Sequence, residues 1–156
     1  MDQALFRDLA PSRILAHDPA TTGLSLSVFL APERLIEAAK RLDSEGWSID
    51  DLTTLDVAEG FEAIYHFSHW LQPGLVALRV LVPHDDPRLP SLAAVFPGAE
   101  WHERESADFY GLTFDNIPNA RPLLLDADQV GLAPLCKEAK ARKPLDSLLP
   151  AGEALA

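Results

Sequence analysis

Alternating apolar and polar positions predict strands in the first half of the chain. Residues 24–30 and 61–70 place apolar side chains on one face at every second position, and residues 75–82 are β-branched and apolar. Residues 47–57 carry a weaker form of the same pattern. The Gln-Pro-Gly turn at residues 72–74 is short enough to require an antiparallel hairpin between the strands on either side. These segments predict a sheet of about four strands, mostly antiparallel.

A helical period follows the first of these strands. Residues 32–46 repeat apolar side chains at helical spacing, with Pro32 in a position that suits the first turn and Gly46 in one that suits the C-terminal end. Glu37 and Arg41 lie four residues apart, so they can pair on the exposed side of this helix. The pattern therefore predicts one amphipathic helix packed on the sheet.

Three shorter helices are also predicted. One precedes Pro11, a second covers residues 91–96 with Ser91 as its N-cap, and a third runs from Ala99 to Tyr110 with Gly111 as its C-cap.

The apolar pattern fades after residue 111. Five prolines interrupt the remaining 45 residues and exclude long helices and central strands there: Pro118, Pro122, Pro134, Pro144 and Pro150. We therefore predict an α+β fold in which a mostly antiparallel sheet of about four strands packs with helices. Residues 1–111 would form this α/β domain, and residues 112–156 an extended proline-rich C-terminal tail that wraps a partner and makes few core contacts of its own.

Composition and charge limit the classes of partner. A net charge of −11 argues against nucleic acid and against docking on anionic lipid, because both need Lys and Arg. Cys136 is the single cysteine, so no internal disulfide can form and a reducing compartment is expected. The chain has no secretory signal pattern and no apolar run of membrane-spanning length, so we expect a soluble chain that other subunits would hold at any membrane.

Three successive charges, Glu103, Arg104 and Glu105, stand out in the last predicted helix. A helix turns about 100° per residue, so at least one of them is expected to meet a partner. Arg104 is four residues before Asp108 and can pair with it. Trp101, Glu105 and Asp108 share one face, and a plain solvated helix explains this pattern as well.

Catalytic and metal-binding patterns are weak. Glu103, Glu105 and Asp108 could serve a stand-alone acid–base hydrolase, but no nucleophile motif or phosphate-binding loop accompanies them. His102-Glu103 lacks the second His of the HExxH zinc signature. Two further metal candidates have better non-metal explanations: His66 with His69, which a strand would point to opposite faces, and His84-Asp85-Asp86, a lone acidic loop. Cys136 without a CxxC pattern is best explained as a spare thiol.

Residues 101–125 resemble the signature of the C subunit, or 30 kDa subunit family, of respiratory complex I, the proton-pumping NADH:quinone oxidoreductase. The family pattern is Glu-Arg-Glu, two residues, Asp, two apolar residues and Gly-Ile, then Phe, Gly-His-Pro and a Leu-Arg-Arg cluster, with Pro-Leu-Arg-Lys-Asp further on. The matching residues here are Trp101, Glu103, Arg104, Glu105, Asp108, Phe109, Tyr110, Gly111, Phe114, Pro118, Arg121, Pro134 and Lys137.

The resemblance extends over residues 47–138 in the same order, and includes the family's Asp-Leu-Thr-Ala-Val-Asp segment at residues 51–56. Four positions depart from the pattern: Asn116 replaces Gly, Ile117 replaces His, Pro122 replaces the second Arg, and Cys136 replaces another Arg. Because two of these changes remove cations, the resemblance implies a divergent partner surface.

The resemblance implies a structural, non-catalytic subunit of the peripheral arm with no catalytic, cofactor-binding or metal site of its own. Its expected partners are the large quinone-site subunit (D type) and the terminal iron–sulfur subunit (B type), at the cytoplasmic side of the membrane. The parent complex would carry FMN and iron–sulfur clusters. Equivalent subunits occur in membrane-bound NiFe hydrogenases and formate hydrogenlyase-type complexes, which form the alternative assignment.

Overall fold

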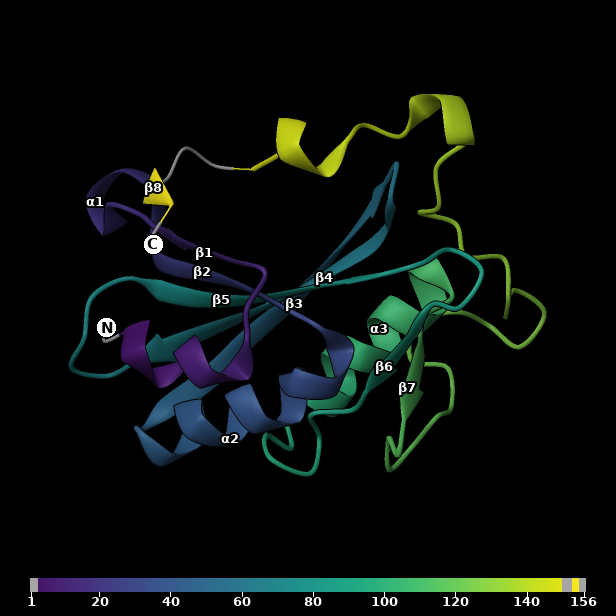
Figure 1. The fold of residues 1–156 in the computed structure, drawn as a ribbon. Coiled ribbons are helices and arrows are strands. Elements are labelled where there is room, and N and C mark those ends of the chain that lie inside the picture. Colours follow the sequence, from purple (N-terminus) through teal and green to yellow (C-terminus); the bar gives the residue numbers. More distant parts are fainter. Residues whose placement is uncertain (1–2, 150–152, 155–156) are drawn as a thin grey trace.

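A six-stranded sheet organises the molecule in the computed structural model, which describes residues 3–149 and 153–154 (Figure 1). Its strand order is β3-β4-β5-β2-β1-β8. The strands are β1 (Arg13–Ala16), β2 (Leu24–Leu30), β3 (Trp47–Val57), β4 (Gly60–His69), β5 (Leu75–Val82) and β8 (Glu153–Ala154). All neighbouring pairs are antiparallel except β2 and β5, which run parallel. The predicted α+β class with a mostly antiparallel sheet is confirmed, and the edge strands β1 and β8 extend it beyond four strands.

Register places the apolar positions of neighbouring strands side by side. Tyr65 pairs with Leu52 on one side and with Leu78 on the other, and Leu78 in turn pairs with Val28. These four side chains are all buried in one core cluster. The predicted hairpin between β4 and β5 is confirmed, because a five-residue connection leaves no room for a crossover.

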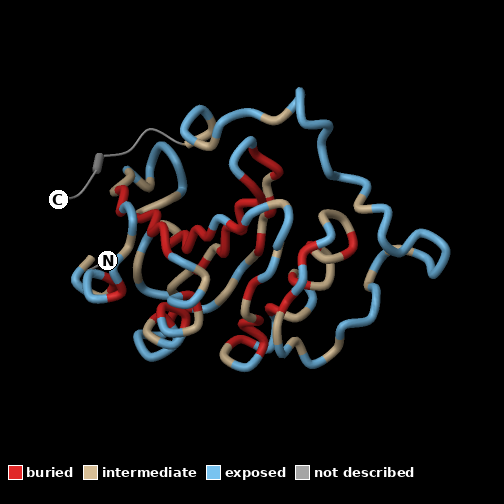
Figure 2. Tube along the Cα trace, turned by 45° about the vertical axis from the view of Figure 1, so that its right-hand side comes forward, coloured by how far each residue is buried: buried red, intermediate tan, exposed pale blue. Residues whose placement is uncertain are grey.

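The helices cover one face of this sheet. The turn η3 (Pro32–Arg34) leads into α2 (Leu35–Ser44), and α3 (Ala99–Tyr110) lies beside it on the same side in Figure 1. Leu35 and Leu42 of α2 are fully buried against the sheet, while the exposed side of the helix carries the predicted ion pair between Glu37 and Arg41. Figure 2 shows the buried stretches gathered between the sheet and these helices.

The N-terminal region differs from its prediction. The helix expected before Pro11 is a pair of short 3-10 turns, η1 (Gln3–Leu5) and η2 (Arg7–Leu9); Phe6 between them and Leu9 in the second are buried. The short helix α1 (Pro19–Thr22) begins after Asp18, whose carboxylate accepts the N–H of Ala20. It connects the two strands β1 and β2.

The helix predicted over residues 91–96 is wrong. This segment forms a turn in which the hydroxyl of Ser91 accepts the N–H of Ala93, as an N-cap would, but no helix follows. Six residues between two prolines are too few to propagate a helix, and Leu92 and Phe96 are instead buried in the core.

A second, two-stranded parallel sheet forms from β6 (Arg88–Pro90) and β7 (Thr113–Asp115), where no strand was predicted; β7 lies at the start of the predicted tail. Leu112 and Phe114 are buried, so the compact part of the chain continues past residue 111. The division into a domain and a partner-wrapping tail otherwise stays a prediction, and Pro150 lies outside the described residues. We call residues 116–149 the C-terminal segment; it contains the turns η4 (Ala139–Ala141) and η5 (Leu145–Ser147).

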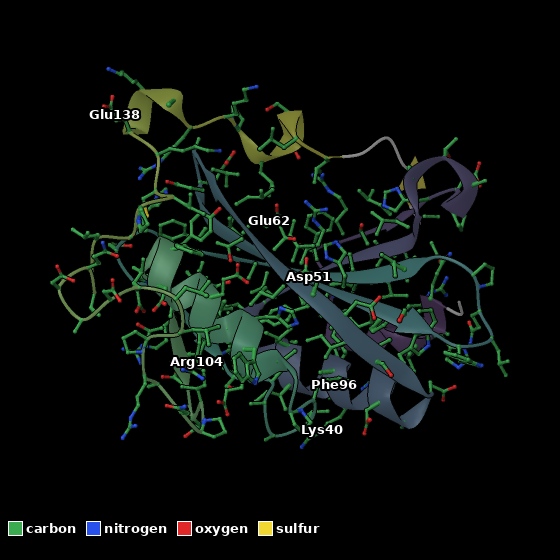
Figure 3. All side chains as sticks on the ribbon, turned by 180° about the vertical axis from the view of Figure 1, so that it is seen from behind. Lys40, Asp51, Glu62, Phe96, Arg104 and Glu138 are labelled. Carbon is green, nitrogen blue, oxygen red and sulfur yellow. The ribbon has the colours of Figure 1, made fainter. Side chains whose placement is uncertain are left out.

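The second face of the sheet carries a buried ion pair. Glu62 of β4 accepts two hydrogen bonds from Arg79 of β5, at 2.7 and 2.9 Å. The guanidinium of Arg79 also lies over the ring of Phe29, 5.1 Å from its centroid. In Figure 3, Glu62 lies on the side of the sheet that faces the C-terminal segment, away from α3. This segment therefore passes over a face of the sheet that is not covered by the helices.

Candidate functional site

Helix α3 carries most of the residues singled out from the sequence. It ends at Gly111, which adopts a left-handed conformation (φ 74°) and donates its N–H to the carbonyl of Ala107. The helix buries Glu103, Ser106 and Asp108 and leaves Trp101 61% exposed. The charged motif is thus directed mainly into the protein rather than into water.

Glu103 fastens α3 to the turn at residues 91–96. Its carboxylate accepts the hydroxyl hydrogen of Ser91 and the backbone N–H of Leu92, each at 2.6 Å. The side chain is fully buried, and this burial raises the pKa of Glu103 to about 7 although the two hydrogen bonds act in the opposite direction. One helical turn later, Ser106 accepts a hydrogen bond from Thr54 of β3 at 3.0 Å.

Asp108 holds the start of the C-terminal segment. One carboxylate oxygen, Oδ2, accepts the backbone N–H groups of three successive residues, Leu123, Leu124 and Leu125, at 2.9, 2.7 and 3.1 Å. Burial alone would raise the pKa of Asp108, but these three hydrogen bonds and the nearby Arg104 charge lower it below its usual value. The ionised carboxylate therefore acts as a fixed acceptor for the chain that crosses it.

Arg104 acts on the same stretch of chain. It donates to the carbonyl oxygens of Arg121 at 2.8 Å and Pro122 at 3.1 Å, and its ion pair, at 3.6 Å, is with Glu100. The predicted pairing of Arg104 with Asp108 is wrong, because both side chains turn to backbone groups of residues 121–125. Figure 3 shows Arg104 on α3, at the side where this stretch passes.

A second buried carboxylate holds the later part of the C-terminal segment. Asp56, at the end of β3, is 0% exposed and accepts the N–H of Lys137 at 2.7 Å. The Nε atom of Arg142 lies 2.8 Å from its carboxylate, as does Nε2 of His84. Burial alone would raise the pKa of Asp56, but the His84 hydrogen bond, the Lys137 N–H and the Arg142 charge lower it.

Further contacts attach residues 143–146 of the C-terminal segment to the sheet. Ala58 donates its N–H to the carbonyl of Lys143 at 3.0 Å, and Glu59 accepts the N–H of Leu145 at 2.9 Å. Arg13 of β1 then pairs with Asp146 at 2.9 Å. The C-terminal segment is therefore fixed to the tip of the β3–β4 hairpin and to the edge of the sheet, along the upper border of Figure 1.

The sequence prediction named Lys137 but missed Asp56 as a site residue. The only signal for Asp56 was its place as the last residue of the Asp-Leu-Thr-Thr-Leu-Asp segment. His84 was weighed as a metal ligand together with Asp85 and Asp86, yet its ring meets Asp56 instead. Among the residues that the structure describes, no group of three or more His, Cys, Asp and Glu side chains could hold a metal ion.

The remaining predicted residues divide between core and surface. Phe114 is buried, and Tyr110 makes an edge contact with Phe61 at 6.3 Å between ring centroids. The carbonyl of Phe109 accepts the N–H of Leu135 at 3.0 Å. Other members of the motif are exposed or half-buried: Glu105, Pro118, Arg121 and Pro134.

Large apolar side chains lie exposed where the C-terminal segment passes α3. Leu124 is 57%, Val130 56%, Leu132 66% and Leu135 50% exposed. Four such residues within one fixed segment are typical of an interaction surface. We call these four residues the apolar row.

Two of the three carboxylates singled out from the sequence, Glu103 and Asp108, are held by contacts within the protein. Glu103 uses both oxygens on Ser91 and Leu92, and Asp108 is occupied by backbone N–H groups. Their arrangement is that of structural acceptors that tie distant segments together. Separately, none of the helices in the described ranges is both long enough and apolar enough to cross a bilayer.

Comparison with known proteins assigns the chain to a family. The profile described as "Respiratory-chain NADH dehydrogenase, 30 Kd subunit" matches residues 28–144. The C subunit of the F(420)H(2) dehydrogenase of Methanosarcina mazei is 38% identical over 77 residues, which cover 49% of this chain and 49% of that protein. The C/D subunit of the NADH-quinone oxidoreductase of Methylococcus capsulatus is 35% identical over 140 residues, covering 78% of this chain and 23% of that one.

A solved structure gives the same result. The trypsin-resistant fragment (1-134) of Nqo5 is 29% identical, with a TM-score of 0.54, over 60% of this chain and 81% of the fragment. The chain spans about half or less of the length of the two curated relatives above. Since the matched region extends over more than half of its residues, the chain belongs to the 30 kDa subunit family of respiratory-chain NADH dehydrogenase.

Proposed function

We propose that this protein is a non-catalytic subunit of the peripheral arm of a proton-translocating NADH:quinone oxidoreductase, where it supports assembly of the quinone-site and iron–sulfur module. The observation that carries the proposal is the C-terminal segment, which buried carboxylates fix in place while its apolar row stays exposed. Fixing this segment in advance lowers the entropy cost of binding, so the apolar row is suited to a permanent partner.

The proposed partners are the large quinone-site subunit (D type) and the terminal iron–sulfur subunit (B type). The Methylococcus relative supports the first of these, since its name joins C and D in one protein. In this proposal the chain binds no cofactor, and FMN and the iron–sulfur clusters belong to other subunits. The protein would lie at the cytoplasmic side of the membrane and be held there by its partners.

A second candidate concerns the electron donor rather than the role of the protein. The Methanosarcina relative is named as part of an F(420)H(2) dehydrogenase, so a parent complex with F(420)H(2) as the electron donor is the alternative that a specific observation favours. The equivalent subunit of a membrane-bound NiFe hydrogenase or formate hydrogenlyase-type complex is the further alternative from the sequence resemblance. The donor site lies on other subunits in each case.

Gentle purification tests the proposal. The chain is tagged, extracted from native membranes in mild detergent, and its companions are identified by mass spectrometry. We expect a large quinone-site subunit and an iron–sulfur subunit to copurify, and oxidation of NADH or of reduced F420 by the purified complex identifies the donor. Recovery of the chain without any such subunit would refute the proposal.

A double variant and its control test whether the apolar row is the surface that binds the companions. Replacing Leu132 and Leu135 by Ser removes two members of the apolar row without removing the backbone bond from Leu135 to Phe109. We expect recovery of the companions to fall about tenfold or more, since each buried Leu contributes on the order of 1 kcal/mol to such an interface. The control replaces the exposed polar residues Asp128 and Gln129 by Ser in the same segment and should leave recovery unchanged.

A further inference from the structure

The turn between β4 and β5 presents two large apolar side chains to solvent. Trp70 is 98% and Leu71 84% exposed, more than any other large apolar side chain in the described residues. This turn lies at one end of the sheet, and the loop of the C-terminal segment that carries the apolar row lies at the opposite end (Figure 1). The two surfaces are therefore separate, and we call Trp70 and Leu71 the apolar tip.

Side-chain bonds fix the backbone of this turn. The ring nitrogen Nδ1 of His69 accepts the N–H of Leu71 at 3.0 Å and the N–H of Gln72 at 3.1 Å. The His69 ring itself packs against Trp47, with 5.3 Å between the ring centroids. These bonds close the turn beneath Trp70 and leave its indole outside.

The other side of the turn is fixed by β2 and α1. Ser25 donates its hydroxyl hydrogen to the carbonyl of Pro73 at 2.9 Å. Gly74 adopts φ +78°, and a Cβ there would meet Oγ of Ser25 at 2.2 Å and the Pro19 ring at 2.9 Å. A glycine is required at this position because the backbone packs so closely. An ordered turn that holds a Trp in water is suited to insertion into a preformed pocket, since little entropy remains to be lost.

The charge around the apolar tip indicates the kind of partner. Three exposed carboxylates flank the tip: Asp50 is bonded to Ser68 at 2.7 Å, Glu45 precedes the glycine that lies beside His69, and Asp18 precedes Pro19, whose ring lies next to Gly74. Anionic lipid is repelled by such a rim, whereas a protein surface with Lys or Arg around an apolar pocket complements it.

We propose that the apolar tip is a second anchor, which inserts Trp70 and Leu71 into an apolar pocket with a basic rim on another protein subunit. Exposed Trp side chains that become buried at interfaces contribute strongly to binding. This anchor lies at the opposite end of the sheet from the apolar row, so the two surfaces can be tested separately. It rests on the proposed function only in that the subunit which provides the pocket is sought in the same complex.

Site-specific crosslinking tests this anchor in the assembled complex. Trp70 is replaced by the photoreactive residue benzoylphenylalanine, the tagged complex is purified from native membranes, and the irradiated sample is analysed by mass spectrometry. We expect crosslinks to one segment of one other subunit, in which apolar residues are flanked by Lys or Arg. Crosslinks to lipid or detergent alone, to a second copy of this chain, or to no polypeptide would each overturn the proposal.

The rate at which the complex dissociates gives a second test of the anchor, with one double variant and one control. Trp70→Ser combined with Leu71→Ser should speed dissociation of the complex at least about tenfold and leave the melting temperature of the isolated chain unchanged, because both side chains are exposed. Gln72→Ser in the same turn is the matched control and should dissociate like the unmodified chain. Unchanged dissociation of the double variant from an intact complex would refute the anchor alone, whereas recovery of the unmodified chain without companions would refute the proposed function.

Discussion

Glu103→Gln should change the pH dependence of stability in a way that identifies Glu103 as a buried proton-binding group. Its carboxyl is fully buried, and burial raises its pKa to about 7 from an ordinary value of 4.5. Below pH 4.5 the group is protonated in both the folded and the unfolded chain, so it makes no pH-dependent contribution. Between pH 4.5 and 7 the folded chain holds a proton that the unfolded chain has released, so the free energy of unfolding falls as pH rises.

The size of the effect follows from the two pKa values. One pKa unit corresponds to about 1.4 kcal/mol, so Glu103 should lower the free energy of unfolding by up to about 3 kcal/mol between pH 4.5 and 8. Gln has the same shape and no charge at any pH. Its carbonyl can accept the N–H of Leu92, and its amide can donate to the hydroxyl oxygen of Ser91, so the attachment to this turn is retained.

Urea denaturation of both proteins from pH 5 to pH 8, followed by circular dichroism, measures this difference. We expect Glu103→Gln to gain stability relative to the unmodified chain as pH rises, by about 2–3 kcal/mol across this range. Glu105→Gln makes the same charge change on the half-buried side of α3 and serves as the control. A difference between Glu103→Gln and the unmodified chain that stays constant with pH would refute the assignment of a raised pKa to Glu103.

Three further changes test how the fold and the C-terminal segment are held. Asp108→Ala removes the acceptor of three backbone N–H groups, so hydrogen exchange at those amides should speed at least about tenfold with little change in melting temperature; unchanged exchange would show that the carboxylate does not hold the segment. Glu62→Gln leaves Arg79 buried without its counter-charge and should cost about 3–5 kcal/mol in urea denaturation, whereas the double replacement by Leu and Met should cost less. Gly60→Ala would place a Cβ 2.1 Å from a backbone carbonyl oxygen and should prevent stable folding, while Gly131→Ala, with nothing within 4 Å, should lose only about 1 kcal/mol by thermal denaturation.

Periodicity was sufficient for the elements with strong local signals. The strands β2, β4 and β5 and the helix α2 were predicted within a few residues, because alternation, helical spacing and flanking Gly or Pro all agree there. The short strands β6 and β7 were not predicted. Each has three residues, and they pair in parallel although more than twenty residues separate them, so neither carries a local pattern.

Long-range contacts explain what the sequence could not predict in the site. Arg104 and Asp108 have the spacing of a helical ion pair, but backbone groups 15–18 positions further along the chain compete for both side chains and are closer. Asp56 meets His84 and Lys137, which are 28 and 81 positions away. Spacing rules for a single helix or strand cannot predict partners so far away in the sequence. The motif therefore predicted the helix, whereas the tertiary fold determines which group each charged side chain binds.

Two of the departures from the family pattern, Ile117 and Pro122, leave these attachments intact. Pro122 stands where the family resemblance expects an Arg, yet Arg104 binds the backbone carbonyl at this position, which proline retains. Ile117 stands where a His is expected, and it packs, partly buried, against the core, so an apolar side chain fits there. Of these two changes, only that at Pro122 lies on the exposed surface of the C-terminal segment, whereas Ile117 faces the core. A change at the exposed Pro122 therefore alters the side chain that the C-terminal segment presents there, and leaves the backbone attachment to Arg104 of α3 as it is.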